Sequence, residues 1–147
     1  MTATEKDQRA AVIAEARTWL RTEYHHQAHV KGGGVDCAWF LIEVYAAAGL
    51  IERFDPGYYP SDWMMHRDEE RYLAWVEKYA HRVDAPQPGD LAVWKFGRTF
   101  SHGAIVLDWP TIIHAYRRER CVTLGDGVKG DFEAPREVLF YSFWGGE

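Results

Sequence analysis

Residues 31–40, KGGGVDCAWF, contain the point at which the fold of this chain is decided. Three glycines form a loop, and Asp36 follows as an N-cap for a helix predicted over residues 37–48, which Gly49 ends. A helix that is apolar on every face belongs at the centre of a domain. One of only two cysteines, Cys37, is therefore predicted to stand at the first turn of a central helix.

The segments on either side of this helix predict an α+β domain. Apolar residues at helical spacing predict further helices over 5–22 and 64–82. Beyond residue 90 the pattern becomes rich in β-branched and aromatic residues, as in strands. The predicted strands span residues 91–96, 102–108, 111–117, 120–124 and 137–144. Because their connections are short, neighbouring strands should be antiparallel. We expect one domain over residues 1–147, with N-terminal helices on a five-stranded, mainly antiparallel sheet.

Charge and composition exclude several classes of protein. The net charge is −5, and the basic residues are scattered, so a nucleic-acid partner is not expected. No stretch has the length and hydrophobicity of a membrane span or a secretory signal. This pattern predicts synthesis in the cytoplasm, and it is compatible with later delivery to a cell wall by a virion or a secretion apparatus. Two cysteines without other disulfide-scaffold features are expected to be free thiols.

The position of Cys37 favours nucleophilic chemistry. Unpaired N–H groups and the macrodipole at a helix N-terminus favour a thiolate, which is the reactive form of cysteine. The same N–H groups can hold an oxyanion as it forms on a carbonyl. The preceding glycines let the backbone bend and leave room for a substrate. The alternative is a buried structural cysteine, and position alone does not choose between the two.

A base for Cys37 must come from another part of the chain. His102 begins one predicted strand, and His114 lies in the next. If the strands pair through the turn at residues 109–110, the two rings share a face only in some registers. In such a register His102 would take the thiol proton and His114 would orient the His102 ring. Taken singly, each histidine is more simply explained as a structural residue.

Five short motifs in this order resemble the NlpC/P60 cysteine peptidases, a papain-like family that acts on bacterial cell-wall peptides. The resemblance implies a papain-like NlpC/P60 fold without a cofactor. It implies that Cys37 is the nucleophile, His102 the base and His114 the third member, with the Tyr24 hydroxyl beside the oxyanion. The matching motifs are Tyr24, GGGVDC at 32–37, PGDLAVW at 88–94, SHGAIVL at 101–107 and IIHA at 112–115.

The stretches at 24–37 and 60–76 are most similar to the phage-tail or prophage branch of the family, which includes gene-transfer-like particles. The resemblance implies hydrolysis of peptidoglycan stem peptides, at the bond between D-glutamate and a diamino acid, with phage-tail proteins as partners. Two alternatives to this peptidase remain open. One is a catalytically inactive structural tail component, and the other is an amidase effector of a contractile secretion system.

Substrate contacts are less well defined than the nucleophile. The family's usual DCSG is replaced here by DCAW at residues 36–39. Asp36, besides capping the helix, is a candidate for binding a substrate amine, and Ser101 and Trp63 are candidates for lining the groove. The remaining ambiguity is YHHQAH, whose His25 and His29 have the i, i+4 spacing of a helical metal pair. The accompanying glutamate of zinc peptidases is missing, so we expect His25, His26 and His29 to serve loop packing or substrate contact, with no metal.

Overall fold

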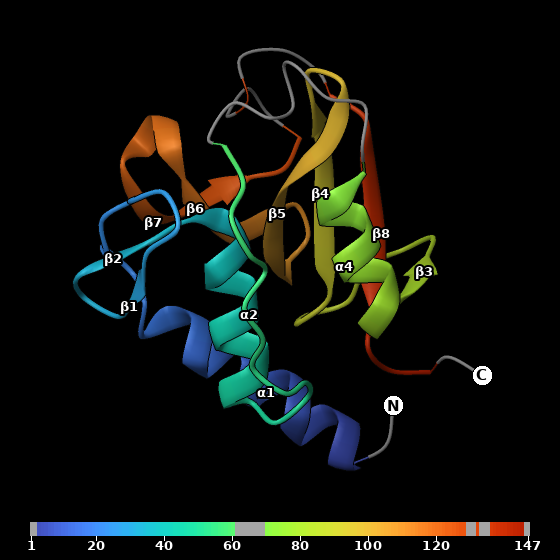
Figure 1. Ribbon diagram of the computed structural model, residues 1–147. Helices are drawn as coiled ribbons and strands as arrows, with labels where there is room; N and C mark the ends of the chain where they lie inside the picture. The colour runs from blue at the N-terminus through green and yellow to red at the C-terminus, as the bar shows by residue number, and fades with distance from the viewer. Residues whose placement is uncertain (1–2, 61–69, 129–131, 133–135, 146–147) are drawn as a thin grey trace.

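The computed structural model describes residues 3–60, 70–128, 132 and 136–145. In these residues the helices are α1 (Ala3–Arg17), α2 (Cys37–Ala47) and α4 (Arg71–Tyr79), with a short 3-10 helix, η1 (Arg117–Glu119). The strands of the main sheet are β3 (His81–Val83), β4 (Leu91–Phe96), β5 (Thr99–Asp108), β6 (Thr111–Tyr116), β7 (Cys121–Asp126) and β8 (Val138–Ser142). A separate ribbon pairs β1 (His29–Val30) with β2 (Gly34–Val35). The predicted α+β class is confirmed (Figure 1).

The main sheet has the order β3-β8-β4-β5-β6-β7, and each neighbouring pair is antiparallel. The predicted count of five strands was wrong, because β3 comes from residues expected to end a helix. Helix α4 ends at Tyr79, and the backbone of Ala80 is extended, with φ −133° and ψ 162°. The next three residues then pair with β8. Residues 64–69 of the predicted helix lie outside the described residues.

Helix α1 is shorter than the predicted helix over 5–22. The hydroxyl of Thr18 donates to the carbonyl of Glu15 at 2.6 Å, a side-chain bond that competes with helix continuation. The backbone of Arg21 is left-handed, with φ 73°, and its N–H donates to the carbonyl of Val122 at 2.9 Å. The segment after α1 therefore turns onto β7 instead of extending the helix.

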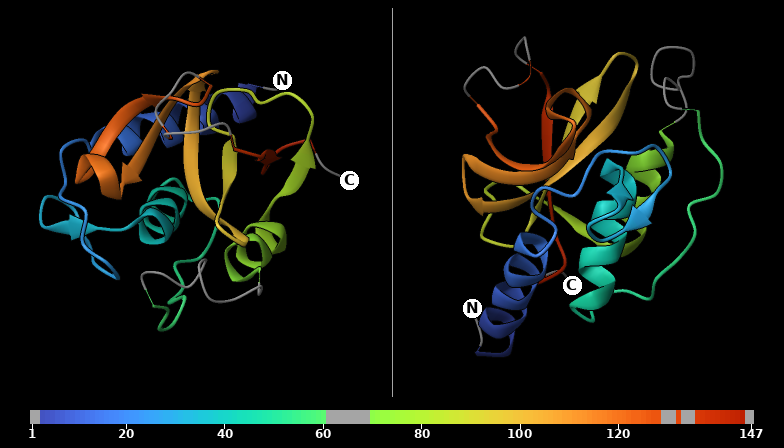
Figure 2. Two further views of the ribbon diagram at one scale, coloured as in Figure 1. Left: turned by 90° about the horizontal axis from the view of Figure 1, so that it is seen from above. Right: turned by 90° about the vertical axis from the view of Figure 1, so that its left-hand side faces the viewer.

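Helices α2 and α4 lie on one side of the sheet, and α1 runs below α2 and past the lower end of the strands (Figures 1 and 2). Helix α2 is buried along almost its whole length, as predicted for a helix that is apolar all round. It packs between α1 and the helix-facing side chains of the sheet, and burying each large apolar side chain contributes about 1.5–3 kcal/mol. Fully buried members of this core include Val12, Phe40, Val44, Val93, Ile105 and Ile113. The centre of the domain is thus fixed by the helix that begins at Cys37.

The other face of the sheet is covered by the sheet itself, which curls over a cluster of aromatic side chains (Figure 2). Trp94 of β4 stacks on Trp109 with ring centroids 6.2 Å apart, and Trp109 lies edge-on to Phe140 at 4.8 Å. A Cβ atom on Gly127, just after β7, would lie 2.5 Å from the Trp109 ring. Only glycine allows the end of β7 to come this close to Trp109.

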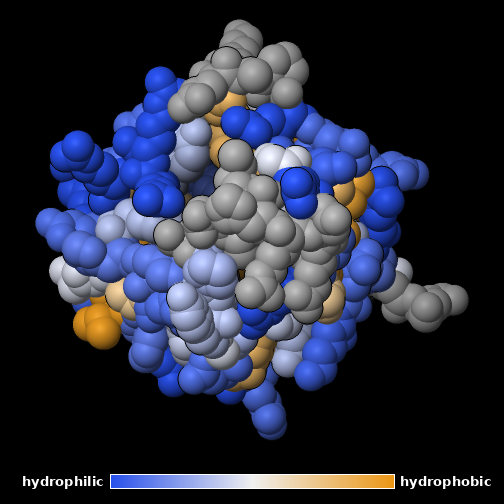
Figure 3. Space-filling view, turned by 45° about the horizontal axis from the view of Figure 1, so that its top comes forward, coloured by the Kyte–Doolittle hydropathy of each residue, from blue (hydrophilic) through white to orange (hydrophobic). Residues whose placement is uncertain are grey.

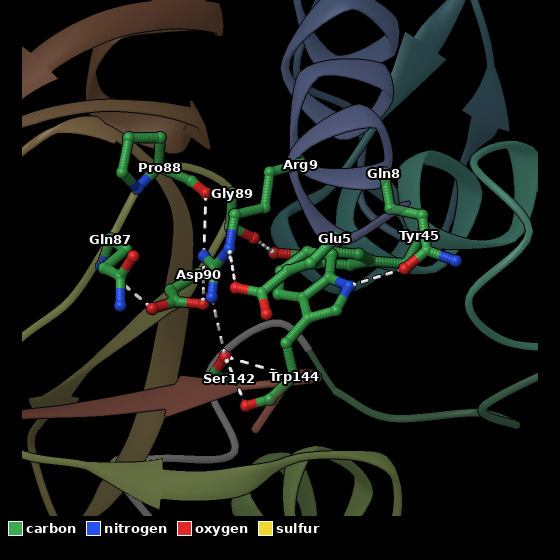
Figure 4. Close-up of polar contacts among 10 residues, drawn as sticks. All are labelled: Glu5, Gln8, Arg9, Tyr45, Gln87, Pro88, Gly89, Asp90, Ser142 and Trp144. Atoms are coloured by element: carbon green, nitrogen blue, oxygen red, sulfur yellow. Dashed lines mark hydrogen bonds and ion pairs between the residues drawn. The ribbon is translucent and has the colours of Figure 1, made fainter. Parts of the chain in front are cut away.

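Helix α1 is fixed to the sheet through a buried ion pair (Figure 4). Arg9 donates from Nη1 to Asp90 Oδ1 and to the carbonyl of Pro88, each at 2.9 Å. Its guanidinium also lies 4.2 Å from the ring of Trp144, whose Nε1 donates to Gln8 Oε1 at 2.8 Å. These contacts hold the N-terminal helix, the start of β4 and the C-terminal segment together.

The surface seen in Figure 3 is mostly hydrophilic, with hydrophobic side chains visible only as small separate spots. Across the described residues, the large hydrophobic side chains that are exposed are Val30, Tyr58, Leu124 and Val128. None of the helices in this part of the chain has the length and hydrophobicity to cross a membrane.

Candidate active site

Cys37 is held at the first turn of α2 by the cap that the sequence predicts. Asp36 has an extended backbone, and its Oδ1 accepts the N–H of Trp39 at 2.9 Å. This bond satisfies one of the free donors of the first turn and fixes where the helix begins. The glycines before it shape the β1–β2 ribbon, since Gly32 has φ +78° and a Cβ on Gly34 would lie 2.6 Å from the His25 ring. These glycines are not among the residues that line the cleft containing Cys37. The prediction that they leave room for a substrate was therefore wrong.

The second oxygen of Asp36 joins α2 to two loops. Its Oδ2 accepts the N–H of Gln27 at 2.7 Å and the hydroxyl of Tyr59. The residue is only 1% exposed. Both oxygens of the carboxylate are therefore occupied by hydrogen bonds within the protein, whereas the sequence suggested Asp36 as a partner for a substrate amine.

The thiol of Cys37 lies against the free edge of β5. Val106 hydrogen-bonds through its N–H to Asp90 and through its carbonyl to Gly89, on the β4 side of β5. Because backbone groups alternate in direction along a strand, the N–H and C=O groups of the odd-numbered residues of β5 point toward β6. The described pairing of β5 with β6 stops at Ile105–Ile113, which leaves the backbone groups of residues 101 and 103 without strand partners. The sulfur takes that place, 3.6 Å from the Ser101 carbonyl, and it also accepts the backbone N–H of Gly103.

Two tyrosine hydroxyls complete the surroundings of the sulfur. The hydroxyl of Tyr72 donates to the Cys37 carbonyl at 3.1 Å, and the hydroxyls of Tyr72 and Tyr24 both lie close enough to Cys37 Sγ to lower the pKa of the thiol. Tyr24 is placed by its N–H, which donates to the carbonyl of Arg120 at 2.8 Å, and by a β-bridge to Val35. Burial raises the pKa of both phenols above the ordinary value, so they remain protonated donors at neutral pH.

The electrostatics of the thiol differ from the expectation for a helix N-terminus. Removal from water raises the pKa of Cys37 to about 12, and the negative charge of Asp36 adds to the effect. The hydroxyls of Tyr72 and Tyr24 and the N–H of Gly103 oppose this rise without reversing it. The free protein therefore holds a neutral thiol, because burial and the adjacent carboxylate outweigh the helix dipole.

The structure brings His102 and His114 together. Both side chains lie on the aromatic face of the sheet, and His102 Nε2 is 2.8 Å from His114 Nδ1. A ring of aromatic residues surrounds the pair. Burial, followed by the charges of His114 and Arg136, lowers the pKa of His102 well below the ordinary value. His102 is thus a neutral imidazole. Because its Nε2 is paired with His114, Nδ1 is the ring nitrogen that can accept a proton.

Cys37 and His102 line the same cleft, which has a volume of about 560 Å³. His114 lies behind His102 and is 1% exposed. The thiol donates to the Ser101 carbonyl, so transfer of its proton to His102 requires the sulfur to leave that bond. Trp63, predicted to line the groove, lies outside the described residues. The described residues that line the cleft are Tyr24, His26, Asp36, Cys37, Ala38, Tyr59, Pro60, Tyr72, Trp75, Phe96, Ser101, His102, Tyr116, Arg117, Arg118 and Arg136.

The histidines of YHHQAH make separate contacts. His25 bonds to Glu23 at 2.9 Å, and His26 bonds to the carbonyl of Tyr59 at 2.6 Å. His29 stacks on Trp39 with ring centroids 4.2 Å apart. Within the described residues there is no group of three or more His, Cys, Asp or Glu side chains arranged to hold a metal ion.

Sequence reasoning missed two kinds of residue in the cleft. Tyr72 falls within the helix predicted over 64–82 and was not a candidate for the site, although its hydroxyl reaches the Cys37 carbonyl. A Cβ on Gly103 would lie 2.6 Å from this hydroxyl, so the glycine after His102 is the local signal for a close neighbour. The arginines at 117, 118 and 136 were also missed, because Arg136 is distant in sequence from the adjacent pair and only the fold brings all three to the lining of one cleft. Cys121, the second cysteine, is a free thiol in β7 opposite Tyr116.

No protein-family model and no curated protein sequence matches this chain. Solved structures do match. The NlpC/p60 domain of the peptidoglycan hydrolase SagA has a TM-score of 0.60 and 22% identity, covering 89% of this chain and 96% of that chain. The peptidoglycan hydrolase RipB from Mycobacterium tuberculosis has a TM-score of 0.63 and 17% identity, covering 97% and 68%. NlpC2 from Trichomonas vaginalis has a TM-score of 0.64 and 14% identity, covering 95% and 47%. The chain therefore has the fold of NlpC/P60 domains, as predicted.

Proposed function

We propose that the chain is a cysteine peptidase or amidase that hydrolyses peptide bonds in the stem peptides of peptidoglycan. The observation that carries the proposal is a single cleft lined by Cys37, at the start of a helix, and by His102, whose Nε2 bonds to His114. The fold shared with domains of peptidoglycan hydrolases supports the substrate class.

The proposed reaction needs only side chains and water. His102 Nδ1 takes the thiol proton as Cys37 Sγ attacks the peptide carbonyl carbon. The bond from this carbon to nitrogen then breaks, and His102 gives its proton to the leaving amine. A water that loses a proton to His102 attacks the resulting thioester, which releases the carboxylic acid and restores the thiol. His114 holds the His102 ring and stabilises its charged form.

The negative charge that forms on the substrate oxygen requires donors near the sulfur. As the first residue of α2, Cys37 has an N–H outside the helical hydrogen-bond ladder. The hydroxyl of Tyr24 already points at the sulfur and can turn to the oxygen as the carbon–sulfur bond forms. These two donors make up the proposed oxyanion site.

The proposal extends to the bond and the route of delivery that the sequence resemblance implies. The bond is the one between D-glutamate and the diamino acid, and a phage-tail or prophage particle carries the protein to the wall. Product masses from defined stem peptides identify the bond. Co-purification with tail proteins supports the particle, whereas co-purification with a contractile secretion apparatus and an immunity protein supports the effector alternative.

The decisive experiment compares Cys37→Ala with the matched variant Cys121→Ala. Purified sacculi and stem peptides are incubated with each protein, and the fragments are measured by mass spectrometry. We expect the wild type and Cys121→Ala to release the same fragments, and Cys37→Ala to be slower by at least about a thousandfold. Equal release by Cys37→Ala and the wild type overturns the role of Cys37.

A second candidate is an inactive structural component of a tail. The high pKa of Cys37, about 12, and its bond to the Ser101 carbonyl favour this candidate, because a neutral thiol is a weak nucleophile. The two candidates differ in whether a thioester forms. Rapid acid quenching during turnover, followed by mass spectrometry of the protein, detects an acyl group on Cys37 if the chain is an enzyme. A chain with neither an acyl adduct nor released fragments is the structural component.

A further inference from the structure

The cleft has a charge opposite to that of the whole chain. The net charge of the protein is −5, yet three arginines line the cleft. The acidic residue among the described lining residues is Asp36, which is 1% exposed and bonded on both oxygens. Three guanidinium groups against one carboxylate leave the described lining of the cleft with an excess of positive charge, which attracts anions. The three arginines are Arg117, Arg118 and Arg136.

Arg136 is the arginine whose charge reaches the catalytic pair. It lies two residues before β8, and its guanidinium carbon is 3.8 Å from the centroid of the Phe96 ring. The Phe96 ring is 5.5 Å from the His102 ring, and Arg136 is one of the charges that lower the pKa of His102. Its Nε–H is buried and has no hydrogen-bond partner among the described residues. Buried donors of this kind are rare in folded proteins and indicate a missing partner.

Ser101 presents a second donor without a partner in the same cleft. The residue is 6% exposed, and its Oγ has no hydrogen-bond partner in the part of the chain that the structure describes. Its backbone carbonyl accepts the thiol of Cys37, and the next residue is His102. The serine therefore lies beside both members of the proposed catalytic pair, with a buried hydroxyl that lacks a partner among the described residues.

We propose that Arg136 and Ser101 bind a carboxylate of the peptide, on a residue that flanks the bond to be cleaved. The proposal rests on the proposed function, and it names the chemical class of ligand that this side of the cleft selects. A carboxylate satisfies the Arg136 Nε–H and the Ser101 hydroxyl together, and hydrogen bonds from a guanidinium to a carboxylate are the strong ones. Arg117 and Arg118 add to the attraction without being required for the contact.

Binding of the carboxylate also has a consequence for the base. A bound negative charge offsets the positive charge of Arg136 beside His102. His102 then accepts the thiol proton more readily when the correct peptide is in place than in the free protein. The neutral resting thiol is in this way compatible with an enzyme that becomes reactive on binding its substrate.

The test uses stem peptides in which one carboxyl group at a time is replaced by a primary amide. The D-glutamate α-carboxyl, the carboxyl of the diamino acid and the terminal carboxyl are compared in turn. For one of them we expect the wild type to hydrolyse the acid with a kcat/KM about 10-fold to 100-fold above that of the amide. The acidic limb of the pH profile of kcat should also lie at higher pH for the acid than for the amide, because the bound carboxylate raises the pKa of His102. If every acid and amide pair reacts within about twofold, a carboxylate site is excluded.

Two variants assign the effect to Arg136. Arg136→Gln should hydrolyse the acid and the amide at the same reduced rate, whereas Arg136→Lys, which keeps the charge, should recover part of the preference. Arg17→Gln removes the same charge from the exposed end of α1, and it should leave the preference unchanged. If Arg136→Gln keeps the full preference for the acid, the assignment to Arg136 is overturned.

Binding separates this inference from the proposed function. Calorimetry with Cys37→Ala measures the affinity for each acid and amide pair without hydrolysis. Tighter binding of the acid that is lost on adding Arg136→Gln supports the carboxylate site, even if the wild type hydrolyses none of the peptides and the proposed function fails. Hydrolysis without any acid preference in rate or affinity overturns the carboxylate site alone.

Discussion

Two buried carboxylates, each 1% exposed, are held in different ways. Asp90 precedes the first residue of β4, and it accepts a guanidinium N–H from Arg9 and the N–H of Gln87 (Figure 4). Asp36 lies in the cleft that Phe96, the last residue of β4, also lines. It is satisfied by the cap of α2, a loop N–H and a phenol. Its basic neighbour within 4 Å in the described chain is a histidine nitrogen, 3.9 Å away.

The difference teaches what each carboxylate does. The charge of Asp90 is offset by a cation, so its effect is to hold α1 against the sheet. The charge of Asp36 is hydrogen-bonded without a guanidinium or ammonium partner among the described residues, and it still acts on Cys37, whose pKa it raises. Both carboxylates build structure, but the uncompensated one also sets the chemistry of its neighbour. The predictions below test this contrast.

The largest expected effect is on stability, at the ion pair. Arg9→Met keeps much of the packing against Trp144 and leaves Asp90 buried without its cation. We expect the free energy of unfolding to fall by about 3–5 kcal/mol, measured by urea denaturation. Arg17→Met, on the exposed end of the same helix, should change it by less than about 0.5 kcal/mol. A loss below about 1 kcal/mol for Arg9→Met would show that the pair contributes little.

The fall of the free energy of unfolding at alkaline pH should reveal the raised pKa of the Cys37 thiol. In the folded chain the pKa of Cys37 is about 12, whereas the ordinary value is near 9. The folded state therefore retains a proton that the unfolded state loses above about pH 9. This contribution to stability is complete below that pH and is lost as pH rises, by up to about 1.4 kcal/mol per pH unit. The difference between the wild type and Cys37→Ser in urea melts at pH 8 to 10 isolates it. Parallel stability curves for the two proteins would contradict the raised pKa.

Removing the charge of Asp36 should sharpen the contrast. Asp36→Asn keeps an N-cap for α2 and deletes the negative charge beside the thiol. In a Cys121→Ser background, alkylation of Cys37 by iodoacetamide at pH 9 should become roughly tenfold faster than with Asp36 present. Asp90→Asn, at the ion pair, serves as the control and should leave the rate unchanged. An unchanged rate for Asp36→Asn would mean that burial alone sets the pKa of Cys37.

The sequence predicts those features that depend on local pattern. Asp36 before an apolar run identifies both the start of α2 and its central position, and alternation identifies the long strands. The strand at residues 81–83 was missed because three residues are too few to show the alternation of a strand. Their conformation is decided by their pairing with β8. The end of α1 was missed for a similar reason, since contacts with β7 redirect the chain after Thr18.

The cleft required the fold. The order of the sequence motifs predicted Cys37, His102 and Ser101 as residues of one site, and the structure places these three in one cleft. The direction of the thiol pKa was not predictable, because it depends on burial and on the absence of a cation beside Asp36 within the described structure. Arg136 was not predictable either, since its proximity to His102 follows from the path of the chain into β8.

The smallest expected effect is at Tyr72, whose hydroxyl opposes the influence of Asp36 on the thiol. Tyr72→Phe removes the hydroxyl that donates to the Cys37 carbonyl and that lowers the pKa of the thiol, so the pKa of Cys37 should rise further. The alkylation rate of Cys37 at pH 9 should fall about threefold, which corresponds to the loss of about 0.7 kcal/mol of hydrogen bonding to the thiolate. Tyr79→Phe, on the same helix and stacked on Phe54, should leave the rate unchanged. A faster rate for Tyr72→Phe would indicate that the phenol shields the thiol more than it stabilises the thiolate. The effect of Asp36 on the thiol would then be opposed by the Tyr24 hydroxyl and the N–H of Gly103.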